Sequence, residues 1–312
     1  MPIVVVIIVT YNGERWIGEC LDCLRRSSQA VRTIIVDNAS SDKTKTIIKS
    51  SFPDVTLIEE EQNLGFGQAN NIALRIALQE NADYVFLLNQ DAYIYPDTIS
   101  ELLSVHSQHK AYGIISPLQL NGSGERLDIR FKKYMANNYA PGLVESVESG
   151  NTNLPMLLPI RFVNAAAWLI SRECLERTGL FHPLFYHYGE DNNYCSRAQY
   201  HGFKAGIATR VSVRHDRSND PSDARSLSRE IRVVPLYLLL DLRKPFFLAY
   251  ILTCWKLVGY IWKGISQWSA EILKQTVYRI KWMITHMALI RKTRKEMKQP
   301  YAGTMPGKLK LL

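Results

Sequence analysis

The chain has 312 residues, 46% hydrophobic and 21% charged, which are the proportions of an ordinary globular protein with a sizeable buried core. Its five scattered cysteines exclude a small disulfide-stapled scaffold and favour a reduced, cytosolic compartment. The net charge of +9 comes from residues 226–312, which hold 16 Lys and Arg against 4 Asp and Glu, so the first 225 residues carry a net charge of −3.

Strand-like and helix-like segments alternate along the first part of the chain. Apolar, β-branched runs predict strands at 3–10, 33–37, 55–59 and 84–88. Apolar residues at helical spacing predict helices at 16–26, from the capping pair Ser41-Asp42 through Ile48, and after the turn at 63–67. This alternation predicts an α/β fold with a mostly parallel sheet and helices on both of its faces.

Polar residues follow three of these strands at the point where each one ends. They are Thr10-Tyr11-Asn12, Asp37-Asn38 and Asn89-Gln90-Asp91. Because sheets of this kind bind ligands at the carboxyl ends of their strands, the coincidence predicts a ligand site at this edge.

The segments beyond the fourth strand predict the rest of the site. Residues 121–153 are polar and in places rich in glycine, which predicts a mobile loop region that covers the site. Phe162–Ile170 returns to a strand pattern, and Ser218–Ser228 is typical of a linker. The run 189–197 places Glu190 beside Asp191 after an aromatic stretch at 185–188. With Asp91, these carboxylates could hold a metal and accept a proton, as transfer from a phosphate leaving group to a hydroxyl requires.

The last part of the chain, 226–312, predicts basic, amphipathic helices. Phe246–Trp262 is apolar apart from Lys256, yet a polar stripe recurs at helical spacing (Thr253, Lys256, Gly259, Lys263, Ser266). An apolar stripe follows on the next helix (Leu273, Val277, Ile280, Ile284, Met287), and four of the six tryptophans and the basic run 291–295 lie in this part. Such helices favour contact with a membrane surface, and two alternatives remain: packing on the domain or on a second subunit, or a membrane-spanning helix at Phe246–Trp262. No nucleic-acid module is recognisable, so no nucleic acid is expected as a partner.

From Val4 to about His215 the chain resembles the family 2 inverting glycosyltransferases of the GT-A fold, in particular a rhamnosyltransferase-like bacterial branch that builds cell-surface polysaccharide. The resemblance rests on the order and spacing of six motifs: 10–12, 36–42, 63–71, 88–91, the run from Glu190-Asp191 through Arg197, and His215. It implies a catalytic domain at 1–225, with a nucleotide-sugar half at about 1–120 and an acceptor half at about 121–225, followed by the helical region 226–312.

The resemblance also implies roles for individual residues. Asp37 corresponds to the aspartate that binds the nucleotide base, and Thr10 and Tyr11 would flank that base. The full expected set of nucleotide-sugar-binding residues is Thr10, Tyr11, Asn12, Asp37, Asn38, Gly65, Gly67, Asn70, Asn89 and Gln90. The glycines would let a helix start close to the donor, which would be a UDP- or dTDP-sugar.

A divalent cation, Mg²⁺ or Mn²⁺, is implied by the motif Asn89-Gln90-Asp91, in which the family's first carboxylate is replaced by Asn89. Asp91 would be the main carboxylate ligand and His215 would complete the set, which suits Mn²⁺ somewhat better. The metal would neutralise charge on the departing nucleoside diphosphate.

Glu190-Asp191 matches the family's catalytic acidic pair. Asp191 would be the general base and Glu190 would position the acceptor, with the reverse assignment open. Family members usually carry an aspartate where this chain has Asn193. Arg197 would hold a phosphate or pair with a nearby carboxylate.

The function implied is an inverting, metal-dependent transfer of a sugar, plausibly rhamnose, to a lipid-linked or polysaccharide acceptor in cell-surface glycan synthesis such as that of O-antigen. The expected location is the inner face of the cell membrane, as a peripheral cytoplasmic protein and a possible homodimer. Two alternatives remain open: a nucleotidyltransferase, or a catalytically degenerate relative that serves as a membrane assembly partner.

Overall fold

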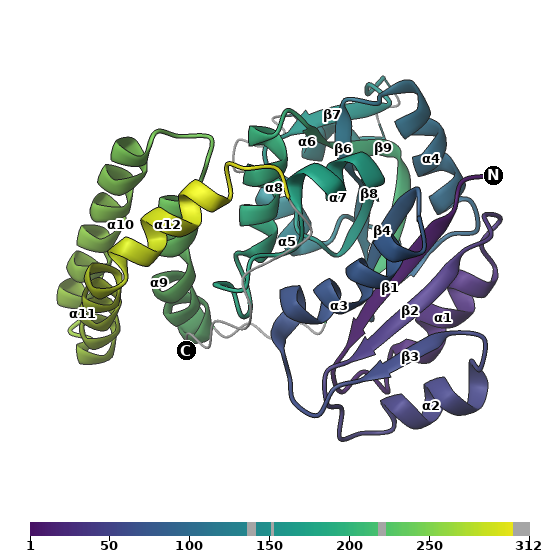
Figure 1. Ribbon diagram of the computed structural model, residues 1–312, viewed down its shortest axis with the longest axis horizontal. Coiled ribbons are helices and arrows are strands. Elements are labelled where there is room, and N and C mark those ends of the chain that lie inside the picture. The colour runs from purple at the N-terminus through teal and green to yellow at the C-terminus, as the bar shows by residue number, and fades with distance from the viewer. Residues whose placement is uncertain (136–141, 151–152, 218–222, 302–312) are drawn as a thin grey trace.

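A computed structural model describes residues 1–135, 142–150, 153–217 and 223–301 of the chain. Figure 1 shows a sheet with helices on both faces and, beside it, a group of helices formed by the C-terminal part of the chain. The last described segment returns from that group towards the sheet domain, so the two parts are joined at more than one place.

In the described residues the sheet has nine strands in the order β3-β2-β1-β4-β8-β6-β9-β5, and β7 pairs with β9. The strands are β1 (Val4–Thr10), β2 (Arg32–Asp37), β3 (Thr56–Glu59), β4 (Tyr84–Asn89), β5 (Ala92–Ile94), β6 (Tyr112–Asn121), β7 (Leu157–Ile160), β8 (Ala167–Ser171) and β9 (Lys204–His215). The predicted parallel arrangement is confirmed for β1 to β4. Beyond β4 the sheet is mixed, because β8 runs antiparallel to both β4 and β6.

The helices of the sheet domain are α1 (Ile17–Arg25), α2 (Thr44–Ser51), α3 (Gly65–Gln79), α4 (Thr98–Gln108), α5 (Ile129–Tyr134), α6 (Leu143–Glu148), α7 (Arg172–Thr178) and α8 (Glu190–Tyr200). The C-terminal helices are α9 (Asp223–Leu240), α10 (Phe246–Ser266), α11 (Ala270–Thr285) and α12 (Met287–Glu296). The predicted capping pair before α2 acts through Asp42, whose Oδ1 accepts the Thr44 N–H at 3.0 Å.

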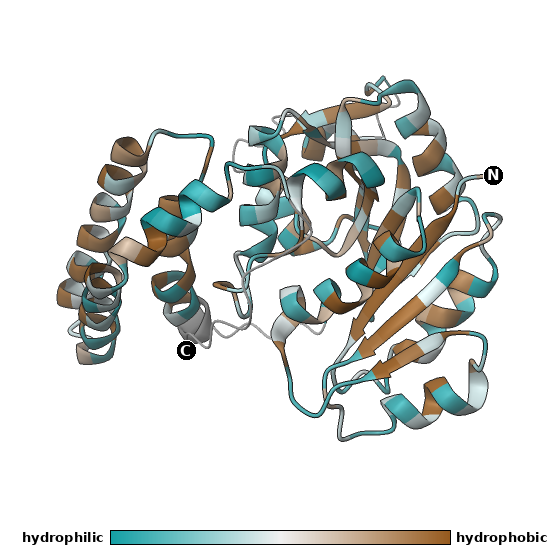
Figure 2. Ribbon diagram, viewed as in Figure 1, coloured by the Kyte–Doolittle hydropathy of each residue, from teal (hydrophilic) through white to brown (hydrophobic). Residues whose placement is uncertain are grey.

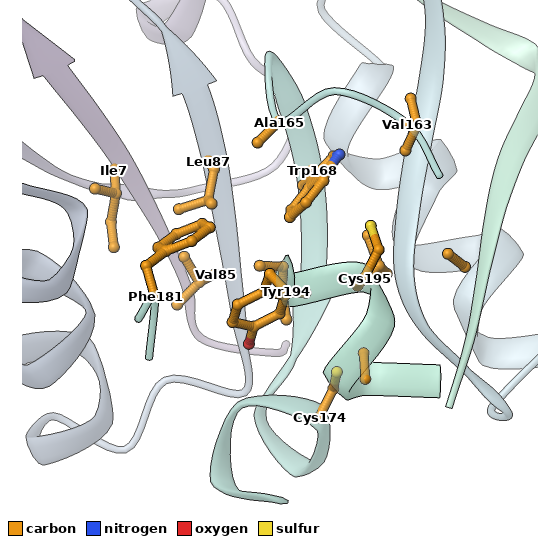
Figure 3. Packing of buried hydrophobic residues seen from close by; sticks show 14 of the residues in the cluster. Ile7, Val85, Leu87, Val163, Ala165, Trp168, Cys174, Phe181, Tyr194 and Cys195 are labelled. Carbon is orange, nitrogen blue, oxygen red and sulfur yellow. The ribbon is translucent and has the colours of Figure 1, made fainter. Parts of the chain in front are cut away.

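The continuous apolar run of β1 is explained by burial on both faces of the sheet. Val5 and Ile7 pack on the α3 side, and Val4, Val6 and Ile8 pack on the side of α1 and α2. Figure 3 shows Trp168, Phe181 and Tyr194 grouped in the first of these cores. The ring centroids of Phe181 and Tyr194 lie 5.0 Å apart, so the core ties the loop before α8 to α8 itself.

The prediction of a loop over 121–153 was wrong for the described part of that region. It contains α5 and α6, and Phe131, Met135, Leu143 and Val144 from it are buried in the core. Asp128 Oδ1 caps α5 by accepting the Phe131 N–H at 2.7 Å. Residues 136–141 and 151–152 lie outside the described residues.

The predicted linker at 218–228 also needs correction, whereas the predicted division of the chain into domains at residue 225 stays a prediction. α9 begins at Asp223, so the described part of that segment is helical rather than a linker, and 218–222 lie outside the described residues. Leu184 and Phe185 of the sheet domain share an apolar core with residues of α9, α10 and α11. The C-terminal helices therefore pack directly on the segment that leads into α8.

The residues of the polar and apolar stripes predicted for the C-terminal helices are exposed only in part. On α10, Lys256 and Lys263 are exposed, but Thr253 is fully buried and donates its hydroxyl to the Ala249 carbonyl at 2.7 Å. On α11 the predicted apolar residues Val277 and Ile284 are exposed, and Thr276, Arg279 and Met283 are buried instead. Among the described residues no helix has the length and apolar character that crossing a membrane requires.

Candidate active site

The ends of β1 and β2 are joined by a buried hydrogen-bond network centred on Asp37. Its Oδ2 accepts the hydroxyls of Thr10 at 2.8 Å and Ser40 at 2.6 Å, and its Oδ1 accepts the Ser40 N–H at 2.8 Å. Asp37 and Thr10 are both fully buried. These bonds give Asp37 a structural role in fixing the two loops, and the predicted bond to a nucleotide base stays a prediction.

The loops after β1 and β2 also hydrogen bond to each other. The Asn12 N–H donates to Ser40 Oγ at 2.9 Å, and Asn12 Oδ1 accepts the Ser41 N–H at 2.9 Å. The Gly13 N–H donates to Thr44 Oγ1 at 2.7 Å. The predicted residue Asn12 therefore holds a two-loop platform at the strand ends.

Tyr11 stands on this platform with a half-exposed ring, as base stacking would require. Gln90 holds its backbone from the loop after β4: Gln90 Oε1 accepts the Tyr11 N–H at 3.0 Å, and Gln90 Nε2 donates to the Tyr11 carbonyl at 3.2 Å. A Cβ on Gly13 would lie 2.2 Å from Gln90 Oε1, so this glycine leaves room for the contact. Gln90 thus shapes the position of Tyr11, a role that the motif alone did not indicate.

The start of α3 is attached to the end of β2 and to the segment before α8. Asn38 Oδ1 accepts the Leu64 N–H at 3.1 Å. Gly65 has φ +76°, and a Cβ there would lie 1.9 Å from the Tyr186 carbonyl oxygen. A Cβ on Gly67 would lie 3.0 Å from Phe181 Cβ. The helix start therefore lies close to the segment 181–186, and its predicted closeness to the donor stays a prediction.

Two neighbouring asparagines of α3 are buried and have protein partners. Asn70 donates to the Phe66 carbonyl of its own helix at 2.9 Å, so its predicted donor contact stays a prediction. Asn71 binds both the N–H and the carbonyl of Phe181, each at 2.8 Å. Sequence reasoning assigned no role to Asn71, which fixes α3 to the segment before α8.

Asn89, Asp91 and His215 lie together at the ends of β4 and β9, as the resemblance implied. His215 Nε2 lies 3.2 Å from Asp91 Oδ1 and 3.5 Å from Asn89 Nδ2. Burial alone would raise the pKa of Asp91, but the hydrogen bond from His215 and the charges of His215 and Arg217 outweigh it, and the pKa lies below its usual value. Asp91 is therefore held as a carboxylate.

This group fits a divalent cation that takes its other ligands from a substrate. Asp91 supplies a charged oxygen whose side chain is 22% exposed, and the described residues bring no three His, Cys, Asp or Glu together into a closed site. One carboxylate with substrate phosphates is normal for Mg²⁺. Arg217 Nε donates to His215 Nδ1 at 3.2 Å, so ligation by Nε2 requires Arg217 to release the ring and the ring proton to move to Nδ1.

Glu190 and Asp191 form the first residues of α8 and differ in their environments. Glu190 is 5% exposed and its Oε2 has no hydrogen-bond partner in the described structure, whereas Asp191 is partly exposed. Asp191 Oδ1 accepts the Asn192 N–H at 2.7 Å. Burial raises the pKa of both carboxyls, and the charge of Asp191 raises the pKa of Glu190 further. The pair therefore holds a proton more readily than ordinary carboxylates do.

Arg217 connects the two acidic parts of the site and was missed from the sequence. Its charge lowers the pKa of both Asp91 and Asp191, and its Nε lies 3.6 Å from Asp128 Oδ2. A hollow of about 240 Å³ lies here, lined by residues of the loop after β6, the start of α5 and the end of β9 (Asn121, Gly122, Asp128, His215, Asp216 and Arg217). A basic residue two positions after His215 is the signal that could have indicated it.

Arg197 has neither of its two predicted roles. It is 1% exposed, which keeps it from a phosphate, and its hydrogen bonds go to the carbonyls of Thr178 at 2.5 Å and Leu180 at 2.7 Å and to Asn193 Oδ1 at 3.0 Å. The amide of Asn193, where the family usually has an aspartate, thus accepts from a buried guanidinium. Arg197 fixes α8 to the segment that follows α7.

Comparison with known proteins places this site in a family. Residues 5–179 match the family described as Glycosyl transferase family 2. The low-salt glycan biosynthesis hexosyltransferase of Haloferax volcanii is 28% identical over 242 residues, which are 77% of this chain and 73% of that protein. The O-antigen chain rhamnosyltransferase WbaN of Salmonella anatum is 25% identical over 224 residues, which are 71% of this chain and 68% of that protein.

A solved structure supports the fold. A mannosyltransferase of Pyrobaculum calidifontis, in complex with GDP-Man and Mn²⁺, resembles this chain with a TM-score of 0.58 and 18% identity, over 95% of this chain and 84% of that one. The likeness confirms the predicted GT-A arrangement of a central α/β sheet flanked by helices.

Proposed function

This chain belongs to glycosyl transferase family 2, and from that premise we propose that it transfers a sugar, with inversion at the anomeric carbon, from a nucleotide-sugar donor to a hydroxyl of a glycan acceptor. One observation carries the proposal. The carboxylate Asp91, with a lowered pKa, and the carboxyl Asp191, with a raised pKa, both lie within the field of Arg217 at one edge of the sheet. Such a pair suits one group that holds a cation and one that takes a proton.

The donor side of the site consists of the platform formed by Thr10, Asn12, Asp37 and Ser40, with the Tyr11 ring above it. The exposed ring offers a stacking surface for a nucleotide base. The amides Asn38, Asn70 and Asn89 and the glycines of α3 border the same edge. The base is proposed to be that of a UDP- or dTDP-sugar, and GDP is a third candidate because the similar mannosyltransferase structure contains GDP-Man.

A divalent cation, Mg²⁺ or Mn²⁺, is proposed to bind Asp91, with His215 as a second ligand. When bound, it would neutralise negative charge on the leaving diphosphate. The similar mannosyltransferase structure contains Mn²⁺, which an imidazole ligand also favours. Arg217, once it releases His215, is placed to add a positive charge beside the same diphosphate.

Asp191 is proposed as the general base, because it is partly exposed and Glu190 is buried. Asp191 takes the proton of the acceptor hydroxyl, and the hydroxyl oxygen forms a bond to the anomeric carbon from the face opposite the phosphate. The bond between that carbon and the phosphate oxygen breaks, and its electron pair leaves with the nucleoside diphosphate. Burial and the neighbouring charge of Asp191 raise the pKa of Glu190 and so favour its protonated form, which avoids two adjacent negative charges.

The sugar and the acceptor are proposed from the relatives. One relative is named as a rhamnosyltransferase of an O-antigen chain and the other as a hexosyltransferase of glycan biosynthesis. We therefore propose a hexosyl group such as rhamnose, and a lipid-linked or polysaccharide acceptor in the synthesis of a cell-surface glycan. Asp128 and Ile129, at the start of α5, line the hollow beside His215 and Arg217, so α5 is proposed to help select the acceptor.

The test is a titration calorimetry panel of UDP, dTDP and GDP, each with and without Mn²⁺, followed by product analysis with the sugar nucleotide of the base that binds. The proposal predicts one preferred base, tighter binding with Mn²⁺, and transfer to a polyprenyl-pyrophosphate-linked glycan with inverted configuration. Absence of binding by any nucleotide to folded protein would overturn it and support a non-catalytic assembly partner. Release of pyrophosphate from a nucleoside triphosphate would indicate a nucleotidyltransferase.

A further inference from the structure

Large apolar side chains gather on the outer face of the C-terminal helices. Eleven of the eighteen exposed large apolar residues among the described part of the chain lie between Phe247 and Ile284. Trp255, Trp262 and Trp268 are 76%, 71% and 96% exposed. Single exposed apolar residues are normal on proteins, but a concentration on one pair of helices marks an interaction surface.

α10 is apolar on two opposite sides. Its inner side carries Ala249, Thr253, Leu257, Tyr260 and Gly264, which pack against neighbouring helices. A Cβ on Gly264 would lie 2.7 Å from a Leu273 methyl group, so α11 lies close against this side. The outer side repeats apolar residues at the same helical spacing (Phe247, Trp255, Val258, Trp262, Ile265). A helix that is apolar on both sides needs a second apolar environment, and the described residues supply only one.

The apolar face continues past the end of α10, and Figure 2 shows hydrophobic segments recurring along both α10 and α11. Trp268 lies in the segment that connects α10 to α11, and Val277, Tyr278 and Ile284 are exposed on α11. We define the docking face as these four residues together with Phe247, Trp255, Val258, Trp262 and Ile265.

Basic residues border the docking face and acidic residues are nearly absent from it. Lys256, Lys263, Lys274 and Lys281 are all exposed, and Glu271 is the one acidic residue between Phe246 and Thr285. Lys256 and Lys263 each follow an exposed tryptophan directly in sequence. Indole and ammonium groups together favour the boundary between lipid headgroups and acyl chains.

The helices of the docking face are attached to the helix that carries Glu190 and Asp191. Ser196 of α8 donates to Asp241 Oδ1 at 2.8 Å, and the Leu242 N–H donates to Ser196 Oγ at 2.9 Å. His201 Nε2 lies 3.0 Å from the Met297 carbonyl. Arg294 of the basic run 291–295 is buried and donates to the carbonyls of Leu239 and Asp241, at 2.7 and 2.8 Å. That arginine is therefore structural, and the docking face is held in a fixed relation to α8.

We propose that the docking face seats α10 and α11 in the plane of an anionic lipid bilayer, with its aromatic residues in the headgroup boundary and its lysines on lipid phosphates. Lipid is favoured over a second copy of the chain because a two-fold pairing of this face would set its lysines against each other with almost no acidic partners. The contact is a property of the C-terminal helices alone, so it stands whether or not the proposed sugar transfer is correct.

The test is vesicle flotation of the full chain with phosphatidylcholine vesicles and with vesicles that also contain phosphatidylglycerol. We expect binding to the anionic vesicles, weaker binding to the neutral ones, and a fall in binding as salt screens the lysines. Trp255→Ser with Trp262→Ser should reduce binding to anionic vesicles by about tenfold or more, because two indoles leave the boundary. Tyr200→Ser is the control, since it removes a partly exposed aromatic (42%) from α8, outside the docking face, and should leave binding unchanged.

A second double variant tests the proposal independently, in case the tryptophan double variant does not fold. Lys256→Glu with Lys263→Glu keeps the aromatic residues and should reduce binding to anionic vesicles while leaving binding to neutral ones unchanged. Asp91→Asn should bind vesicles as the wild type does, which separates docking from nucleotide binding. Equal binding of wild type and both folded double variants would overturn the proposal. So would a wild-type dimer, seen by sedimentation velocity without lipid, that the tryptophan variant converts to a monomer.

Discussion

Two aspartates of the candidate site show how the surroundings of one residue type can shift its pKa in opposite directions. Asp91 receives a hydrogen bond from His215, and despite burial its pKa lies below the usual value. Asp191 stands beside a second carboxyl at the start of α8, where burial raises its pKa. The surroundings of Asp91 therefore keep its carboxylate ionised. The surroundings of Asp191 favour a carboxylate that accepts a proton readily.

The difference arises from the elements around each residue. Asp91 follows β4, where β5 pairs with β9 and brings Ala92 opposite His215. Asp191 lies in the first turn of α8, and the segment before this helix packs against the C-terminal helices through Leu184 and Phe185. The pKa is therefore lowered for the carboxyl at the sheet edge and raised for the one at the helix start, which suits the two roles proposed above.

The largest expected effect comes from removing the proton acceptor. Asp191→Asn should lower the rate of transfer by about a thousandfold, the range of general base catalysis, with nucleotide affinity unchanged. Glu190→Gln, which resembles the protonated residue, should lower the rate by no more than about tenfold. Initial rates with a saturating donor measure both. A larger loss for Glu190→Gln than for Asp191→Asn would assign the base to Glu190.

A structural prediction concerns the contact where α3 meets the acceptor side. Gly65→Ala should lower the free energy of unfolding by about 3 kcal/mol, because the new Cβ would meet the Tyr186 carbonyl at a position with φ +76°. Gly142→Ala is the control with a similar φ of +79° and no atom within 4 Å of a new Cβ, so it should cost only about 1 kcal/mol. Urea unfolding measures both, and equal losses would show that the close contact is absent.

The smallest expected effect is a change in how stability depends on pH. Because burial, together with the charge of Asp191, raises the pKa of Glu190 in the folded protein, the folded state binds its proton more tightly than the unfolded state does. Stability is then greatest below the unfolded glutamate pKa of about 4.3 and is lost as pH rises towards the raised folded pKa. Glu190→Gln should reduce this decline by about 1 kcal/mol or more between pH 5 and 8 in urea unfolding. An unchanged decline would show that Glu190 is not held protonated.

Most of the nucleotide side of the fold could be predicted from the sequence. The strand ends at Thr10, Asp37 and Asn89 lie where the patterns placed them, because a buried parallel strand reads as a continuous apolar run. The mixed sheet beyond β4 could not be predicted, since β8 enters from far along the chain. The short helices α5 and α6 were missed because six residues carry too little periodicity to identify a helix.

The residues of the site were easier to identify than their partners. The family resemblance implied that Asn89, Asp91 and His215 belong to the candidate site, and the structure brings these three side chains together. The bond between Gln90 and the Tyr11 backbone, and the ion pair between Arg217 and Asp128, join segments that are far apart in sequence, so local patterns could not predict them. On α10 the helical spacing of the polar residues could be predicted, but the side of the helix that is buried could not. Thr253 donates its hydroxyl to a carbonyl of its own helix, so this polar residue can face a core.

Asp91 is proposed to bind the cation, and Asp191 is proposed to accept the proton. The most direct test is to titrate the preferred nucleotide into Asp91→Asn and Asp191→Asn, each with and without Mn²⁺. We expect Asp91→Asn to lose the gain in affinity that Mn²⁺ gives the wild type, and Asp191→Asn to keep it. Retention of that gain by Asp91→Asn, or its loss in a folded Asp191→Asn, would show that these two roles are wrongly assigned.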